Sequence, residues 1–307
     1  MNRRRADLVL LFVALLWGTT FVAQKTANEH IGPLLFVGVR FLMAAVFLLP
    51  LVLWEARRTP ADGEPAMPAL RTRDIGAGLL IALCLCAGCW MQQIGLQTTT
   101  ATNAGFLTAM YMVLVPFVAW GFSRRRPRPL VLVAVAMGMF GAWLLAGAGP
   151  LDQWSPGDAI VLAADLIWAL HIVLIGHFRG ISARPMLLSF VQCAFTGLVS
   201  LPLALAWQPA TRDALVAALP AIIYAGIFSS GVAFTLQIVA QRHTPPAEAA
   251  LIMSLESVFS ALAGALLLGE MLSLGAALGA TLILAAVVLV EVGPLALDWL
   301  ARQRAVS

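Results

Sequence analysis

Charged residues are scarce in this chain. Asp, Glu, Lys and Arg make up 11% of its 307 residues, whereas apolar residues make up 61%. An average soluble domain carries roughly 25% charged residues. A chain this poor in charge could not cover its own surface in water, so we expect lipid to be its solvent and partner. The 19 basic residues stand in short clusters between apolar runs, which argues against nucleic acid as a partner.

Patterns that carry chemistry are also few. The four cysteines are Cys84, Cys86, Cys89 and Cys193, and no His stands at a zinc-ligand spacing from them. The first three, at spacings of two and three, cannot share one face of a helix. We interpret the cysteines as small packing residues and expect no metal and no cofactor. Because the chain has no Gly-x-x-x-x-Gly-Lys sequence, any use of ATP would need a separate subunit.

Long apolar runs are what the chain has in abundance. A helix needs roughly 20 mostly apolar residues to cross the bilayer. Inside lipid every backbone group must be hydrogen-bonded, which only helices and closed barrels achieve, and these runs are about twice the length of a barrel strand. We therefore predict an all-α integral membrane protein with ten transmembrane helices and one sizeable loop at 54–74. The predicted helices are 7–27, 33–53, 75–97, 102–122, 129–148, 157–178, 185–206, 214–238, 246–268 and 273–293.

Basic residues are distributed unequally between the alternate loops. Sixteen of the 19 fall on one side of the predicted spans, Lys25 and Arg212 on the other, and Arg40 lies within the second span. Loops rich in Lys and Arg stay in the cytoplasm. We therefore predict a multi-pass protein of the cell (inner) membrane with both termini cytoplasmic. The N-terminus resembles a signal peptide but lacks a clean cleavage site, so we expect it to be retained as the first helix.

The two halves of the chain resemble each other. Gln97-x-x-Thr100 precedes the fourth predicted span, and Gln241-x-x-Thr244 precedes the ninth. Five spans per half is an odd number, so the second half must be inserted upside down relative to the first. We therefore predict two inverted repeats, residues 1–148 and 149–307. In transporters built this way the substrate site lies near the bilayer midplane between the repeats.

Three longer segments carry a family resemblance. They are Leu15-Leu16-Trp17-Gly18-x-x-Phe21, Phe36-x-x-x-Arg40-Phe41-x-x-Ala44, and the run from Ala249 to Glu270. On these residues the chain resembles the EamA-type, ten-helix branch of the drug/metabolite transporter superfamily, over essentially its whole length. Two features depart from the family pattern: Ser257 stands where Pro is usual, and the fourth span lacks the Leu-Gly-Glu that ends the ninth.

The resemblance implies a fold and a function. Two bundles of helices would surround a central cavity lined by spans 1, 3, 4, 6, 8 and 9, with spans 5 and 10 outside. Within the branch the chain is similar to the YddG-type exporters of aromatic amino acids and related metabolites. We therefore expect a secondary transporter, not an enzyme, that exports small metabolites such as aromatic or neutral amino acids by alternating access. The oligomeric state stays open.

Charged side chains inside the predicted spans are candidates for the site, because each costs roughly 2.5–3.5 kcal/mol to insert. They are Arg40, Asp165, Glu256 and, near a span end, Lys25. Three roles stay open for these groups. They form ion pairs between helices, they bind a charged or zwitterionic substrate, or one of the carboxylates takes up and releases a transported proton.

Central aromatic residues are the second set of candidates, since Trp usually gathers at the membrane interfaces. Trp17, Trp168 and Tyr111 lie near the centres of their spans, and Trp90 lies nearer the outer side. Rings around a cavity suit apolar or aromatic substrates, and plain helix packing is the alternative. His171 shares a helix face with Asp165 and Trp168. The predicted substrate-binding residues are Trp17, Trp90, Tyr111, Trp168, His171 and Glu256.

Two rival functions stay open from the residues alone. Asp165 and His171 would serve as the acid–base pair of an intramembrane enzyme, although one carboxylate and one imidazole do not make a catalytic site without a positioned partner. A lipid-handling membrane subunit is the other rival, and the loops show no large basic pocket that would favour it. Retained transport in a His171→Ala/Asp165→Asn variant would leave the enzyme without support.

Overall fold

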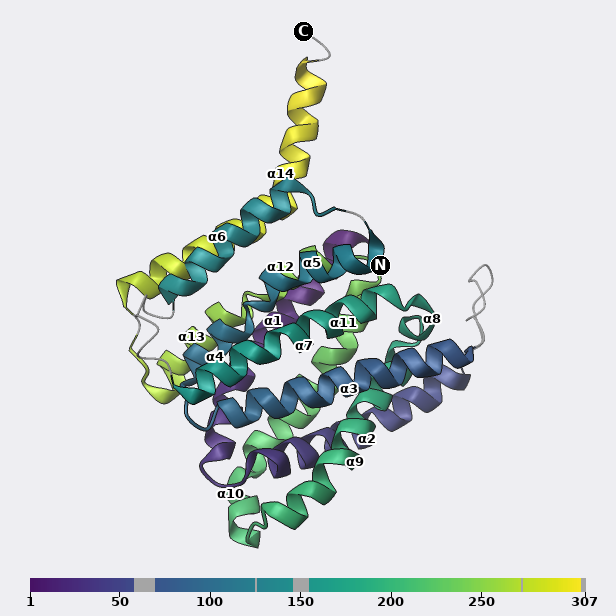
Figure 1. Ribbon diagram of the computed structural model, residues 1–307, viewed down its shortest axis with the longest axis vertical. Helices are drawn as coiled ribbons and strands as arrows, with labels where there is room; N and C mark the ends of the chain where they lie inside the picture. The colour runs from purple at the N-terminus through teal and green to yellow at the C-terminus, as the bar shows by residue number, and fades with distance from the viewer. Residues whose placement is uncertain (58–69, 125, 146–154, 272, 305–307) are drawn as a thin grey trace.

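The computed structural model describes residues 1–57, 70–124, 126–145, 155–271 and 273–304, and these residues form helices and no strand (Figure 1). The prediction of an all-α membrane fold is confirmed. Most of the predicted 54–74 loop lies outside the described residues. The helices are α1 (Arg3–Asn28), α2 (Pro33–Arg57), α3 (Thr72–Gly95), α4 (Ala101–Thr108), α5 (Tyr111–Ser123), α6 (Pro129–Leu145), α7 (Pro156–His177), α8 (Arg179–Ser182), α9 (Pro185–Trp207), α10 (Arg212–Ile223), the π-helix η2 (Tyr224–Ala233), α11 (Phe234–Gln241), α12 (Pro246–Met253), α13 (Glu256–Leu268) and α14 (Leu274–Arg304).

The helices group into ten segments that correspond to the ten predicted spans. By length and composition, eight continuous or broken helices of the described chain are apolar and long enough to cross a membrane, and 129–144 and 274–290 form two shorter apolar helices. Three of the eight are composite: α4 continues into α5, α10 continues through η2 into α11, and α12 continues into α13. The helices that contain these two segments, α6 and α14, pack against each other along one side of the molecule (Figure 1).

Two spans are broken near the middle in the same way. In α4–α5 and in α12–α13 a helix of 8 residues leads into one of 13 residues. At each break the backbone tightens to i−3 hydrogen bonds, from Met110 N to Leu107 O (2.9 Å) and from Leu255 N to Ile252 O (3.2 Å). Such tightening bends a helix while keeping its backbone groups paired. Because of the break, a second helical segment begins near the middle of each of these two spans.

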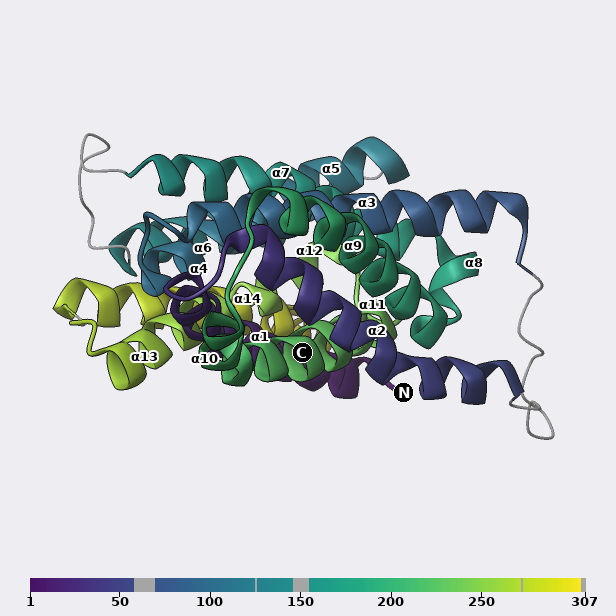
Figure 2. The ribbon, with the colours of Figure 1, turned by 90° about the horizontal axis from the view of Figure 1, so that it is seen from below.

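The helices form two bundles that mix the two halves of the sequence. We group α3, α4, α5, α7 and α9 as the first bundle and α1, α2, α10, η2, α11, α12 and α13 as the second; α2 and α9 pack closely against each other across the boundary. Figure 2 shows α3, α5 and α7 on one side of the molecule and α1, α10 and α13 on the other. The first two spans of each half have therefore crossed into the bundle of the other half.

Matching contacts tie each crossed helix to its bundle. The Thr99 hydroxyl, ahead of α4, donates to Asp158 in the first turn of α7. The Thr244 hydroxyl, ahead of α12, donates to Asp7 Oδ1 of α1 at 2.7 Å. Packing is matched too, because α1 lies against α12 and α13 as α7 lies against α4 and α5. The repeats 1–148 and 149–307 stay a prediction, and their junction at 146–154 lies outside the described residues.

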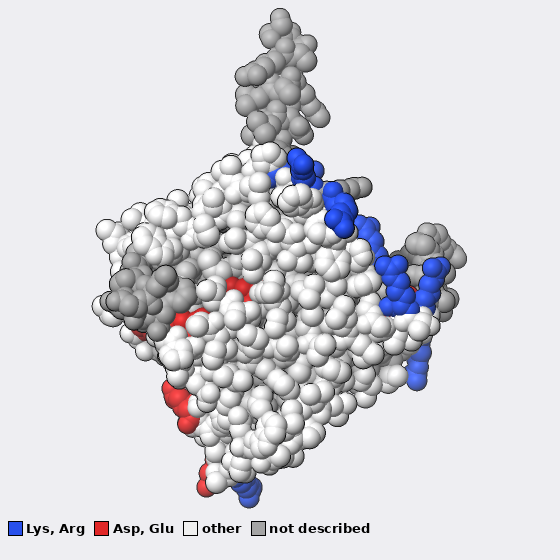
Figure 3. Space-filling model, viewed as in Figure 1, with Lys and Arg blue, Asp and Glu red and all other residues white. Residues whose placement is uncertain are grey.

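Charged side chains on the surface lie toward the ends of the spans. On the face seen in Figure 3, Lys and Arg gather along one edge, Asp and Glu lie toward the opposite edge, and uncharged side chains cover the area between. The basic edge includes the N-terminal end of α1, where Arg3 pairs with Glu248 of α12 and lies 3.7 Å from Asp7. Arg128 lies 3.9 Å from the same Glu248. An uncharged band between two charged edges is the surface expected of a protein in a bilayer.

Candidate functional site

A cavity lies between the two bundles, and the centres of water-sized spheres fill about 40 Å³ of it. About 10–15 Å³ of such volume holds one water, so the cavity as it stands holds a few water molecules. Among the described residues neither α6 nor α14 contributes to the lining, as the family resemblance implied, whereas α2 contributes Arg40, which it did not imply. The first bundle contributes Cys89, Gln92, Thr108, Tyr111, Trp168, His171 and Ile172, and the second contributes Trp17, Thr20, Phe21, Gln24, Arg40, Ser229, Phe234, Gln237 and Glu256.

Phe234 is the centre of an aromatic wall. Its ring centroid lies 5.0 Å from that of Trp17 and 6.4 Å from that of Trp168, and its plane is 15° from the latter. It also meets the His171 ring edge-on at 6.1 Å. The π-helix η2 ends directly before Phe234, and the Trp17 indole donates to the Ser229 carbonyl of η2 at 3.4 Å. π-helical turns are uncommon and occur often at functional sites.

A glycine allows the wall to close. A Cβ built on Gly88 of α3 would lie 3.0–3.2 Å from the Trp168 ring, so this ring lies directly on the α3 backbone. The Trp168 indole N–H is buried and has no hydrogen-bond partner among the described residues. It is therefore available to an acceptor that enters the cavity.

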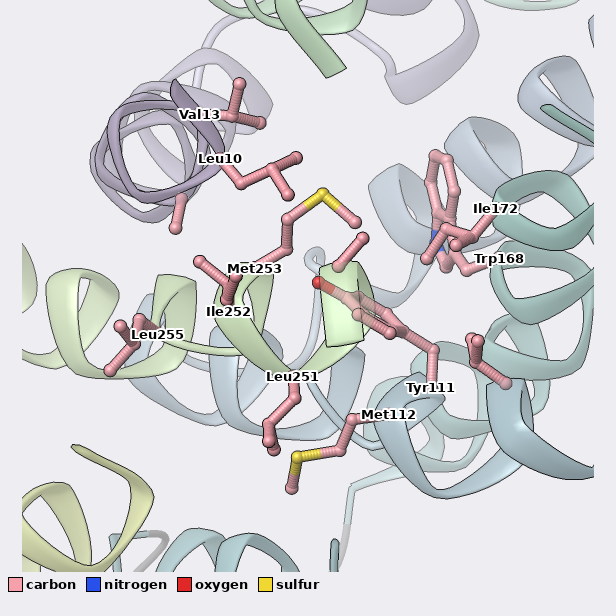
Figure 4. Close-up of a cluster of buried hydrophobic side chains, with 14 of the residues drawn as sticks. Leu10, Val13, Tyr111, Met112, Trp168, Ile172, Leu251, Ile252, Met253 and Leu255 are labelled. Carbon is pink, nitrogen blue, oxygen red and sulfur yellow. The ribbon is translucent and has the colours of Figure 1, made fainter. Parts of the chain in front are cut away.

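Tyr111, Asp165 and Glu256 form an acidic end of the site. Tyr111 and Glu256 are the first residues of α5 and α13, so the two helix breaks bring them to matching positions on opposite bundles. All three side chains are buried and lie within electrostatic range of one another. The Tyr111 hydroxyl and the Glu256 carboxylate lie beside each other, and both Asp165 oxygens have no hydrogen-bond partner in the described chain. Figure 4 shows Tyr111 crossing from α5 toward Ile252 and Met253.

Arg40 lies apart from these carboxylates. Its guanidinium carbon is 5.1 Å from the Phe36 ring centroid and 4.8 Å from the Phe41 ring centroid. No Asp or Glu of the described residues lies within ion-pair distance of Arg40. An ion pair between Arg40 and Asp165, one of the roles left open by the sequence, is not formed in this structure, because the two residues face different groups. Asp165 does not line the cavity either, and lies behind Glu256 and Tyr111.

Two further predicted residues have other partners. Trp90 is absent from the lining, because its indole N–H donates to Ser200 Oγ of α9 at 2.7 Å. Successive helical residues point about 100° apart, so Cys89 on the same helix faces the cavity and Trp90 turns away from it. His171 lines the cavity, and its Nε2 lies 2.6 Å from Gln192 Oε1.

Several lining residues were missed in the sequence. Gln92 donates to Thr108 Oγ1 at 3.2 Å across the first bundle. Neither amide atom of Gln237 has a partner in the described chain, although both are buried. Because polar side chains are rare in spans, Gln92, Thr108, Ser229 and Gln237 carry a signal in the sequence that could have identified them. Phe234 could not be identified in this way, because an apolar Phe is common in a membrane span.

Hydrogen bonds join the two bundles toward each end of the spans, on either side of the cavity. Gln93 of α3 donates to the Gln24 carbonyl of α1 at 3.0 Å and to Asn28 Oδ1 at 2.9 Å. At the basic edge Gln241 of α11 donates to the Ile172 carbonyl of α7 at 3.2 Å. We name these contacts the Gln93 latch and the Gln241 latch. Each is a buried glutamine whose Oε1 is unpaired among the described residues.

Lys25 reinforces the closure at the Gln93 end. Its ammonium donates to the Leu96 carbonyl at 3.0 Å and to the Thr99 carbonyl at 2.6 Å. Leu96 caps the end of α3, and Thr99 lies directly before the N-cap of α4. Lys25 therefore joins α1 to the first bundle, and it does so without an acidic partner among the described residues.

Comparison with known proteins gives consistent results. The sequence pattern of the EamA-like transporter family matches residues 4–147 and 155–292. An uncharacterized transporter of Archaeoglobus fulgidus is 31% identical over 291 residues, which cover 95% of this chain and 87% of that protein. The uncharacterized inner membrane transporter YedA of Escherichia coli K12 is 27% identical over 294 residues, which cover 92% and 90% of the two chains.

Two more matches are limited, one in the length that it covers and the other in its sequence identity. A probable amino-acid metabolite efflux pump of Salmonella typhimurium is 31% identical over 198 residues, which cover 62% of this chain and 60% of that protein. A protein of known crystal structure has a TM-score of 0.74 with this chain at 17% identity, and the match covers 95% of this chain and 98% of that one. At that identity the structural match shows a shared fold.

Proposed function

The chain belongs to the EamA-like transporter family, and from this premise we propose that it is a secondary transporter that exports small metabolites, amino acids above all. It is a multi-pass membrane transporter by family and by its apolar helices. The observation that carries the proposal is the closed central cavity between two bundles, with Glu256 and Arg40 among its lining residues. Substrate sites of inverted-repeat transporters lie in this place.

The two latches support transport by alternating access. Opening the Gln93 latch while the Gln241 latch holds would expose the cavity to one side of the membrane, and the reverse would expose it to the other. The bodies that rock are the two bundles, not the two sequence halves, because the first two spans of each half belong to the opposite bundle. The inverted repeats 1–148 and 149–307 supply two arrangements of nearly equal energy.

The substrate class rests on the chemistry of the lining. Glu256 provides acceptors for an ammonium group, with Tyr111 beside it, and the wall around Phe234 provides an apolar surface for a side chain. The resemblance of one relative, a probable amino-acid metabolite efflux pump, supports the same class. Because the closed cavity holds only a few waters, an amino acid enters when a latch opens and the cavity widens.

Orientation and coupling complete the proposal. The edge with the Lys and Arg clusters faces the cytoplasm of the cell, and the Gln93 latch faces outward. Protons are the proposed coupling ion, because Asp165 and Glu256 are neighbouring buried carboxyl groups without a basic partner in the described chain. The alternative of an intramembrane enzyme needs His171 and Asp165 as an acid–base pair. His171 instead contacts Gln192, and the Asp165 oxygens accept no hydrogen bond from the described residues.

The test is efflux from proteoliposomes that contain the purified full chain and radiolabelled amino acids. We expect efflux of at least one of the twenty standard amino acids, faster with a proton gradient directed inward. Glu256→Gln should reduce this efflux, whereas Glu29→Gln, which alters an exposed carboxylate at the end of α1, should not. Absence of efflux for all twenty would refute the substrate class, and efflux indifferent to the gradient would refute proton coupling.

A further inference from the structure

We infer that Arg40 is the receptor for the carboxylate of the transported amino acid and therefore a residue that determines substrate specificity. The inference rests on the proposed function, because it assigns one group of the proposed substrate to one side chain. The supporting evidence is the environment of the guanidinium and the charges of the cavity.

Arg40 is a buried cation that has no anionic partner in the part of the chain that the structure describes. Only 3% of the residue is exposed, and its Nε has no hydrogen-bond partner among the described residues. The polar side chains that interact with it are the thiols of Cys89 and Cys193, which are weak acceptors. A desolvated charge of this kind is costly to keep unless an anion and further hydrogen bonds compensate it. A bound carboxylate would supply both.

The surroundings hold the guanidinium ready for such a ligand. Phe36 and Phe41 stand one turn before and one residue after Arg40 on α2, and both rings lie within cation–π distance of it. Arg presents a flat fork of donors that matches a carboxylate with two parallel hydrogen bonds. The aromatic contacts restrict the fork without using its donors, so binding loses little side-chain entropy.

The charges of the cavity favour an amino acid over a polyanion. Of the described residues that line the cavity, Arg40 is the one Lys or Arg, and Glu256 of α13 is the one Asp or Glu. A single guanidinium balances the single charge of a carboxylate, whereas a phosphate would bring nearly two charges beside Glu256. One cation and one carboxylate in the same cavity complement a zwitterion, with the ammonium at Glu256 and the carboxylate at Arg40.

The experiment compares amino acids with the amines that lack their carboxylate. Phenylalanine, leucine and serine are titrated into the purified full chain beside phenethylamine, 3-methylbutylamine and ethanolamine, with calorimetry as the readout. The wild type should bind an amino acid roughly 10- to 100-fold more tightly than its amine, from the strength of a charge-assisted hydrogen-bonded pair. Arg40→Met should remove this ratio, and Arg40→Lys should retain part of it, because lysine keeps the charge and loses the fork.

The matched control is Arg73→Met. Arg73 also lies over an aromatic ring, Phe178 at 5.5 Å, but is exposed and outside the cavity lining, so its loss should leave the ratio unchanged. Equal weakening of amino acid and amine in Arg40→Met, or a wild-type ratio near one while amino acids are exported, would overturn the inference alone. If the wild type neither binds nor exports any amino acid, the proposed substrate class fails first. A variant that elutes as an aggregate is replaced by Arg40→Gln in the same titration.

Discussion

Replacing Gln93 or Gln241 by methionine removes one latch and leaves the other in place. Methionine has nearly the shape of glutamine but cannot donate to a carbonyl, so the substitution removes hydrogen bonds with little change in packing. Gln93 donates two hydrogen bonds to α1, and Gln241 donates one to α7. Under alternating access, each variant should shift the conformational equilibrium toward opening at its own end.

The structure sets the size of each shift. A neutral hydrogen bond contributes about 0.5–1.5 kcal/mol, and about 1.4 kcal/mol is a factor of ten. Loss of two bonds in Gln93→Met should therefore raise the population open at that end by roughly 5- to 150-fold. Loss of one bond in Gln241→Met should raise the population open at the basic edge by roughly 2- to 12-fold.

Cys89 reports both openings, because it lines the cavity and is buried in the closed state. With the other three cysteines replaced by alanine, a membrane-impermeant maleimide is added to whole cells or to inverted membrane vesicles. Gln93→Met should accelerate labelling of Cys89 in cells, and Gln241→Met should accelerate it in vesicles. Gln97→Met, at an exposed position after α3, is the matched control and should change neither rate.

Two outcomes would refute the reasoning in different ways. Acceleration of both variants from the same side, or of neither while both remain folded, would show that these glutamines do not close the cavity at opposite ends. Acceleration of each variant from the side opposite to the one expected would keep the latches and reverse the proposed orientation in the membrane.

Three further predictions concern packing and the site. Gly18→Ala should lower the melting temperature in detergent, because the new Cβ would lie 2.5 Å from the Phe259 Cβ and overpacking costs about 1–3 kcal/mol. Gly121→Ala, whose Cβ would have no atom within 4 Å, should not lower the melting temperature. Equal melting temperatures of the two variants would contradict the close approach of α1 to α13. Phe234→Leu should weaken binding of phenylalanine more than binding of leucine, because pairs of aromatic rings contribute about 0.5–1.5 kcal/mol beyond the burial of apolar area. Equal weakening of both ligands, measured by calorimetry, would show that the aromatic wall does not contact the substrate. Trp90→Phe should retain efflux while lowering thermal stability by about 1 kcal/mol through the lost indole hydrogen bond, and an altered amino-acid preference in this variant would return Trp90 to the site.

Much of the fold could be predicted because its causes are local in the sequence. An apolar run long enough to cross lipid must be helical wherever it lies in the bundle, so the spans were found from residue type and length. The spans broken at 109–110 and 254–255 were predicted as single helices, because no Pro or Gly marks either break. The π-helix η2 was likewise not foreseen.

The candidate site was predicted in part for a similar reason. Trp17, Tyr111, Trp168, His171, Glu256 and Arg40 were found because such groups are rare in the middle of a span, and all six line the cavity. Their roles in binding remain proposals. Trp90 and Asp165 met the same criterion of rarity and do not line it, since rarity does not say which way a side chain points.

The sequence by itself determined that lipid is the solvent, that the fold is helical, and which few polar side chains lie inside the spans, where their insertion is costly. Those properties depend on the composition of one segment at a time. Only the tertiary structure decided that α1 and α7 cross into opposite bundles, that Arg40 and Asp165 face different partners, and that Phe234 joins the rings of Trp17 and Trp168. Which helix faces share a cavity depends on packing between segments far apart in the chain, and residue composition does not encode that packing locally.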